Sequence, residues 1–154
     1  QFVIIGHSEN REKGESDKLI NLKIKSALEA KLKVIFCIGE TLVEKKRKKT
    51  QSILSKQIKI GLDKVKKKSD IFIAYEPVWA IGTGIVPESG DLLKTVKFIK
   101  SRFKNKLPRV LYGGSVNPQN IKNLKEINNI DGFLIGGASQ NAKKFIDIVK
   151  KTYS

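Results

Sequence analysis

Five short apolar blocks recur along the chain, and each is followed by a longer stretch in which apolar and polar residues are mixed. The blocks lie at Phe2–Ile5, Lys33–Ile38, Ile71–Tyr75, 109–112 and 132–135. Short and nearly continuous apolar runs are typical of strands that are buried on both faces. The pattern therefore predicts five strands of a parallel sheet.

The stretches between the blocks carry apolar residues every three or four positions, which is the period of one helix face. Four such stripes are Ile20, Ile24, Ala27 and Leu28; Leu54, Ile58, Leu62 and Val65; Leu92, Val96, Ile99 and Phe103; and Phe145, Ile146 and Val149. Asn117 and Ser139 are typical N-cap residues, and Pro118 suits the first position of a helix. We therefore expect helices between the strands, with one helix beginning after Asn117 and the last one after Ser139.

Strands that alternate with helices indicate βαβ units around one parallel sheet. No linker or low-complexity stretch divides the 154 residues, so we expect a single α/β unit. In such a fold the loops after the strands emerge on one side, where (β/α)8 barrels and open sheets place their sites. These loops are polar or rich in glycine, at 6–9, 39–40, 76–77, 113–115 and 136–139.

Composition narrows the class of protein further. The apolar runs fall well short of the roughly 18 residues that a membrane-spanning helix needs, and no secretory leader precedes the first strand. The only cysteine, Cys37, lies in an apolar run, and one thiol cannot form an internal disulfide. We therefore expect a cytoplasmic protein with no membrane partner.

The beginning of the chain has the character of the middle of a strand. Residues 1–5 are apolar after the first position, with no preceding turn, and the 154 residues contain no methionine. We therefore expect the chain to be part of a longer polypeptide.

The formal net charge is +16, and it comes almost entirely from lysine. Proteins that read nucleic acids usually combine basic patches with arginine forks and stacking aromatic residues, and the sequence has neither pattern. A solvated, lysine-rich surface that attracts anionic substrates is the favoured interpretation. A basic nucleic-acid-binding protein remains an alternative that is motivated by charge alone.

The segment 74–84, AYEPVWAIGTG, contains the first candidate for chemistry. Glu76 directly follows an apolar block, and Gly82 and Gly84 close the loop after it. Glycines let a loop move without steric penalty, and a mobile loop can exclude water from a site. This favours a catalytic base under a lid, although Glu-Pro and Gly-Thr-Gly are also common in ordinary loops.

His7 is the only histidine and directly follows the first apolar block. Taken alone, such a residue is more often a hydrogen-bonded core histidine. Together with Glu76 on the same rim, it suits proton abstraction next to a carbonyl. The carboxylate would take the carbon-bound proton while the imidazole polarises the oxygen.

Two glycine-rich loops, at 113–115 and 136–137, are candidates for phosphate binding. Their backbone N–H groups would be accessible, and the second loop lies just ahead of an expected helix start, which attracts anions. Either loop alone is also compatible with an ordinary strand-to-helix turn. Barrels commonly bind phosphate at the loops after their last two strands.

Five motifs along the chain carry a family resemblance. They are Ile5-Gly6-His7-Ser8-Glu9, Cys37-Ile38-Gly39-Glu40-Thr41, the segment 74–84, Tyr112-Gly113-Gly114-Ser115-Val116 and Ile135-Gly136-Gly137-Ala138-Ser139. In this order they resemble the triosephosphate isomerase family over essentially all 154 residues. The resemblance implies a (β/α)8 TIM barrel, of which residues 1–154 would form strands 4–8 with their helices, the C-terminal part of one domain.

The resemblance also implies catalytic roles. Glu76 would be the general base and His7 the neutral electrophile that interconvert dihydroxyacetone phosphate and D-glyceraldehyde 3-phosphate through an enediolate, as is established for the family. Glu9 matches a carboxylate of secondary importance. Residues 77–84 would form the lid.

The same resemblance implies substrate-binding residues and partners. The phosphate ligands would be Gly82, Ser115, Gly136 and Gly137, and the pair that keeps Glu76 dry would be Ile81 and Leu134. The family uses neither a cofactor nor a metal, so its only expected ligand is a small phosphorylated triose. The full-length protein is expected to be a cytoplasmic homodimer of glycolysis and gluconeogenesis, with no nucleic acid partner.

Departures from the family pattern limit what this chain can do alone. The family's substrate-binding lysine, with a nearby asparagine, precedes the region that the chain resembles, and no lysine of this chain occupies that place. Asn10 and Arg11 stand where the family usually has paired arginines, which leaves the local salt bridging open. We expect the isolated chain to be inactive or feebly active, and a non-enzymatic phosphate-binding relic is the alternative function.

Overall fold

The computed structural model describes residues 1–103 and 107–154. One parallel sheet of five strands runs through the molecule in the order β1-β2-β3-β4-β5, which is also the order along the chain. The strands are β1 (Phe2–Ile5), β2 (Lys33–Ile38), β3 (Ile71–Tyr75), β4 (Val110–Tyr112) and β5 (Gly132–Phe133). The five predicted strands are confirmed, although β4 begins one residue later and β5 ends two residues earlier than the apolar blocks.

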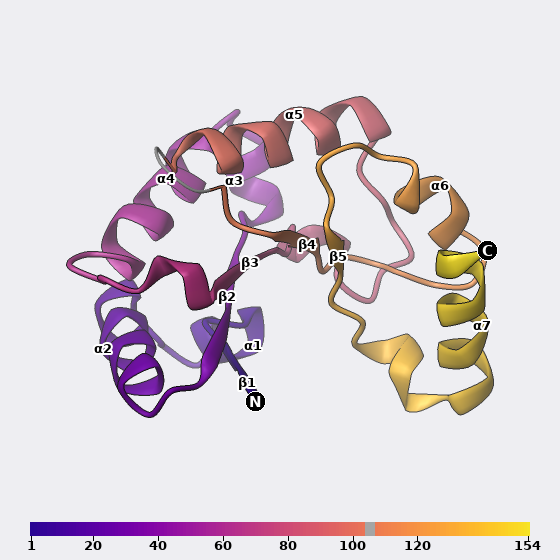
Figure 1. Cartoon of the computed structure of the whole chain (residues 1–154). Helices are drawn as coiled ribbons and strands as arrows, with labels where there is room; N and C mark the ends of the chain where they lie inside the picture. The colour runs from indigo at the N-terminus through magenta and orange to yellow at the C-terminus, as the bar shows by residue number, and fades with distance from the viewer. Residues whose placement is uncertain (104–106) are drawn as a thin grey trace.

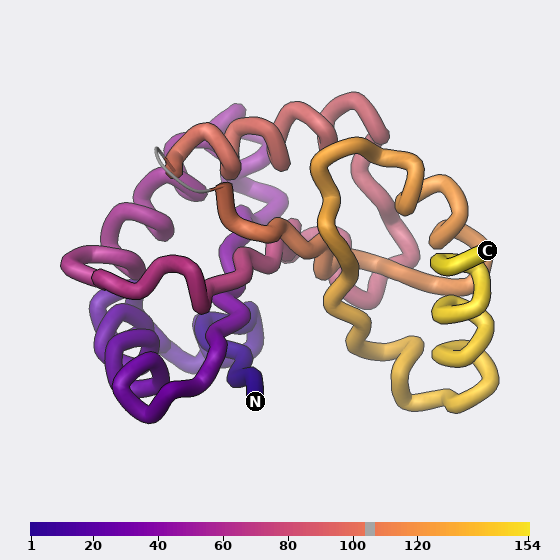
Figure 2. The backbone as a smooth tube through the Cα atoms, viewed as in Figure 1, coloured from indigo at the N-terminus to yellow at the C-terminus, as the bar shows by residue number. Residues whose placement is uncertain are grey.

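Helices follow one another around the outside of the sheet, and the ring is open between β1 and α7 (Figure 1). The helices are α1 (Ser8–Glu12), α2 (Asp17–Glu29), α3 (Leu42–Lys46), α4 (Thr50–Gly61), α5 (Ser89–Ser101), α6 (Ile121–Lys125) and α7 (Ala142–Tyr153), with short 3-10 turns η1 (Lys68–Asp70), η2 (Val78–Ala80) and η3 (Gly137–Gln140). The tube in Figure 2 shows the N-terminus at β1 and the C-terminus at the end of α7. This arrangement is a partial α/β barrel.

Most of the core lies between the sheet and the helices α2, α4 and α5. The predicted stripes supply it, because Ile20, Leu54 and Val96 are fully buried, as is Phe36 of β2. Helix α4 approaches β2 very closely at Gly61, where an added Cβ would lie 2.5 Å from the Phe36 ring. Glycine therefore lets α4 pack directly on the sheet.

The stripe predicted on the last helix is not buried. Phe145, Ile146 and Val149 are 40%, 52% and 40% exposed, whereas Ile148 is the buried residue of α7. The cause is that α7 packs mainly on α6 and η3, and among the described residues no strand packs extensively on its other face. The predicted helix is confirmed, but its apolar face, which was expected to be buried in the core, is exposed to solvent.

The two predicted helix starts are also wrong by a few residues. Asn117 accepts hydrogen bonds from the N–H groups of Gln119 and Asn120 and so caps a turn, and α6 begins later, at Ile121. Before the last helix, the glycine loop forms the separate turn η3. Asn141, and not Ser139, then caps α7 by accepting from the Lys144 N–H.

The helices of the described residues include none that is both long enough and apolar enough to cross a membrane.

Candidate active site

A cavity of about 500 Å3 opens at the carboxyl ends of the strands. It is formed by the loops after β1, β3, β4 and β5. All six site residues predicted from the sequence line it: His7, Glu76, Gly82, Ser115, Gly136 and Gly137. The fold therefore brings together residues that are up to 130 positions apart in the sequence (7 to 137), while their chemical roles stay predictions.

His7 is fixed by the first turn after β1. It occupies the N-cap position of α1, and its Nδ1 accepts a hydrogen bond from the Glu9 N–H at 3.4 Å. A neutral imidazole that accepts at Nδ1 carries its proton at Nε2. That Nε2 lies 3.4 Å from Oε1 of Glu76 and faces the cavity.

Arg11 holds this turn against β2. Its guanidinium donates to the Gly6 carbonyl at 2.8 Å and to the Cys37 carbonyl at 3.1 Å, and it forms an ion pair with Asp17 at 2.7 Å. Gly6 has a φ of 78°, a conformation that favours glycine. The single arginine thus supplies the local salt bridge that the sequence comparison had left open.

Glu76 stands at the end of β3 and is only 3% exposed. Its N–H continues the sheet by donating to the Ile38 carbonyl at 2.8 Å. Burial raises the pKa of its carboxyl group, and the neighbouring His7 acts in the opposite direction. The side chain fits because position 113 is glycine, where a Cβ would lie 2.8 Å from Cγ of Glu76.

Residues 77–84 form a loop that borders the cavity. Ser115 fixes the C-terminal part of this loop by hydrogen bonds. The Ser115 hydroxyl donates to the Ala80 carbonyl at 2.8 Å and accepts from the Gly84 N–H at 2.9 Å. Gly82 and Gly84 have φ values of 68° and 78°, which other residues rarely adopt. The loop therefore has the glycine-dependent geometry expected of a lid.

The near end of this loop is anchored on a buried acid, Glu40, which is 1% exposed. Trp79 donates from Nε1 to Oε1 of Glu40 at 3.0 Å, and the Tyr75 hydroxyl donates to the same carboxylate at 3.2 Å. Burial raises the pKa of Glu40, and these donors oppose that rise. Nζ of Lys45 lies over the Trp79 ring, 3.5 Å from the ring centroid.

Two functional candidates were missed in the sequence. The sequence places Glu40 in a loop and in a family motif but assigns it no role. The signal that could have identified it is an acid just after a strand, in a chain whose one tryptophan lies in the expected lid. Lys144, in the first turn of α7, lines the cavity beside Gly137. Its only sequence signal is that it lies seven residues after Gly137, in the expected last helix.

The arrangement suits proton transfer on a small phosphorylated carbonyl compound. A buried carboxylate and an imidazole N–H face the same space, and two glycine loops border it. Within residues 1–103 and 107–154, no group of three or more histidine, cysteine or acidic side chains is placed to hold a metal ion.

Comparisons with known proteins agree with this geometry. The family model described as triosephosphate isomerase matches residues 1–152. The triosephosphate isomerase of Thermodesulfovibrio yellowstonii is 46% identical, over 97% of this chain and 64% of the relative. Those of Prosthecochloris aestuarii and Chlorobium luteolum are 46% and 45% identical, with 62% and 63% of each relative covered.

The chain thus spans slightly less than two thirds of the length of these curated relatives. The match extends over nearly all of its own residues and includes every loop that borders the cavity. The chain therefore belongs to the triosephosphate isomerase family.

Proposed function

We propose that the polypeptide carrying this chain is a triosephosphate isomerase, which interconverts dihydroxyacetone phosphate and D-glyceraldehyde 3-phosphate. The observation that carries this proposal is the distance of 3.4 Å between Nε2 of His7 and Oε1 of Glu76 on the wall of one cavity. A base and a hydrogen-bond donor at that separation can act on adjacent atoms of one small substrate.

In this mechanism Glu76 removes a proton from one carbon of the triose phosphate and returns it to the neighbouring carbon. Burial raises the pKa of its carboxyl group, which makes the carboxylate a stronger base. His7 donates its Nε2 proton in a hydrogen bond to the oxygen on which negative charge develops. The contact of Nδ1 with the Glu9 N–H supports the tautomer that this role requires.

The phosphate would be bound by backbone and hydroxyl donors. Gly82, Ser115, Gly136 and Gly137 border the same cavity, and uncovered backbone N–H groups favour anions. Ile81 and Leu134 also line the cavity and would keep water from Glu76 when the lid 77–84 is closed.

The reaction moves a proton within one substrate and so consumes no oxidant or reductant, and with Glu76 and His7 in these roles we expect no cofactor or metal. We further propose that residues 1–154 are the C-terminal part of a single TIM-barrel domain, whose first three strands belong to the same polypeptide. The full-length protein would be a cytoplasmic homodimer of glycolysis and gluconeogenesis. Its only partner besides its own second copy would be the triose phosphate, and neither nucleic acid nor a membrane takes part.

A phosphate-binding protein without enzymatic activity is the second candidate. The glycine loops and Ser115 are part of this chain, whereas the family's lysine loop has no counterpart among its residues. Loss of one preorganised charged or donor group typically lowers turnover by about 10²–10³. Phosphate binding could therefore persist where isomerisation does not.

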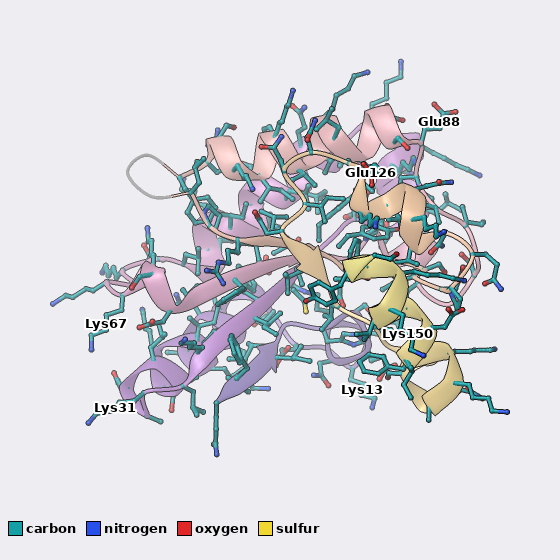
Figure 3. The ribbon with its side chains drawn as sticks, turned by 45° about the vertical axis from the view of Figure 1, so that its right-hand side comes forward. Lys13, Lys31, Lys67, Glu88, Glu126 and Lys150 are labelled. Atoms are coloured by element: carbon teal, nitrogen blue, oxygen red, sulfur yellow. The ribbon has the colours of Figure 1, made fainter. Side chains whose placement is uncertain are left out.

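The test is to express the natural polypeptide that contains these residues and to measure isomerisation in both directions. We expect turnover, and we expect Glu76→Gln to lower kcat by about 10²–10⁴, the usual contribution of a general base. Glu126→Gln is the matched control, because Glu126 is exposed and lies at the C-terminal end of α6; it is labelled in Figure 3. Phosphate binding without turnover in the unsubstituted protein would instead establish the non-enzymatic alternative.

A further inference from the structure

A second hollow lies at the amino ends of the strands, on the other end of the sheet from the candidate active site. It has a volume of about 860 Å3 and is walled by the end of α4, the segment that follows α4, and the end of α5. Six basic residues line it: Lys59, Lys64, Lys66, Lys67, Lys68 and Arg102. We propose that this basic hollow binds a small anion that carries several phosphate groups.

The basic side chains of the hollow are exposed and lack carboxylate partners. The ion pairs of the described residues involve other cations, and none of them uses a residue of this group. Among the residues that the structure describes, Asp63 is the only acid that lines the hollow. Figure 3 labels Lys67 on the opposite side of the molecule from Lys150 of α7.

Helix ends explain only part of this concentration of charge. The C-termini of α4 and α5 both meet the hollow, and a helix C-terminus carries about half an elementary negative charge. Two termini and one aspartate balance about two of the six positive charges. A surplus of about four charges therefore remains, and the lysines repel one another until an anion is bound.

The size and the residue types of the hollow indicate the class of ligand. Its volume falls within the range of about 300–1,000 Å3 that is common for small-molecule sites. Lysine binds phosphate as a point charge, without the planar geometry that arginine uses to read one particular group. A ligand with several phosphates gains binding energy by contacting several lysines at the same time, whereas a single phosphate does not. Inorganic polyphosphate and nucleoside triphosphates share this chemistry.

The proposal is independent of the isomerase reaction, whose substrate carries one phosphate and would bind at the opposite end of the sheet. The test uses the natural polypeptide that contains these residues, with inorganic tripolyphosphate as the probe in titration calorimetry. The variant K66Q/K67Q/K68Q removes three charges from the hollow. The control K18Q/K122Q/K150Q removes three exposed charges from α2, α6 and α7.

We expect tripolyphosphate to bind, and we expect the hollow variant to weaken binding by about tenfold, because each exposed ion pair contributes roughly a factor of two. The control variant should bind as the parent does. Equal weakening in both variants, or no binding by the parent, would overturn the proposal. Comparable binding of ATP without divalent cations would support recognition of the phosphate chain, and binding of ATP but not tripolyphosphate would contradict it.

Amide chemical shifts give a second measurement that does not depend on any variant. Tripolyphosphate should perturb the amides of residues 59–68 and of Arg102. Perturbation confined to the glycine loops 113–115 and 136–137 would place the anion in the other cavity and overturn the assignment. Binding of single-stranded DNA alone would identify a nucleic-acid surface and would equally overturn it.

Discussion

Opposing influences act on the carboxyl group of Glu76. Burial raises its pKa, while His7, the Cys37 thiol and the Ser8 N–H favour the ionised form and lower the pKa. The carboxylate is therefore desolvated but retains nearby groups that stabilise its charge. Such a balance is common for bases whose position, as well as basicity, has to be controlled.

The position of Glu76 depends on Gly113, and this gives a testable prediction. A methyl group in Gly113→Ala would lie 2.8 Å from Cγ of Glu76, so the carboxylate has to move. A displacement of about 1 Å can lower a rate about 10²-fold. We therefore expect kcat of the natural polypeptide to fall by about that factor, as measured by steady-state isomerisation.

Gly90→Ala is the matched control, because a Cβ there meets no atom within 4 Å and Gly90 lies in the exposed first turn of α5. The control should keep parental kcat. Unchanged kcat in Gly113→Ala would show that the approach of Gly113 does not position the carboxylate.

Individual residues differed in how far the sequence revealed them. His7 and Glu76 were predictable because each lies within two residues of the end of an apolar block, and strand ends converge in a parallel sheet. Glu40 follows its strand at the same spacing as His7, but its role and that of Lys144 were not predictable, since they arise from contacts across the fold. Glu40 meets Trp79 39 positions away, and Lys144 reaches the cavity only through the turn η3.

At the scale of elements, the strands were predictable and the helix boundaries were not. A strand buried on both faces leaves a continuous apolar run, whereas caps depend on turns that the apolar period does not record. The loop before α7 forms η3, so its helix begins after Asn141. The α7 face at 145–149 has helical period, yet its burial depends on whether another element covers it.

The lid loop contacts helix α3 through Trp79, whose ring lies under Lys45. This arrangement predicts the effect of removing the indole N–H donor of Trp79. Trp79→Phe keeps an aromatic ring beside Lys45 but removes the indole N–H that donates to buried Glu40. The Tyr75 hydroxyl still donates to this carboxylate at 3.2 Å, and the loss of one hydrogen bond to a charged group typically costs about 1.5–3 kcal/mol. We expect the free energy of unfolding of the natural polypeptide to fall by about that amount, measured by urea denaturation.

Lys45→Gln provides the comparison, because it removes the cation over the ring and leaves the hydrogen bond. Its cost should be smaller, about 0.5–1 kcal/mol for a surface cation–π contact. A larger loss in Lys45→Gln than in Trp79→Phe would assign the anchoring of the loop to the cation instead of Glu40.

For the whole molecule, the exposed apolar surfaces predict how these 154 residues behave alone. Phe2 and Ile4 on β1 are 53% and 48% exposed, and the α7 face at 145–149 is open as well. Unpaired parallel edges with apolar side chains favour association. We expect the isolated chain to be oligomeric or poorly folded in size-exclusion chromatography with light scattering. A monodisperse monomer with a cooperative thermal transition would contradict this expectation.

The sheet order has a consequence for how the molecule is made. Every strand pairs with the strand that immediately follows it in the sequence, from β1 to β5. Contact order is therefore kept low for a parallel sheet, and each βα unit can dock on its predecessor soon after it leaves the ribosome. Assembly can follow the direction of translation, with β5, the last of these strands to be synthesised, docking last.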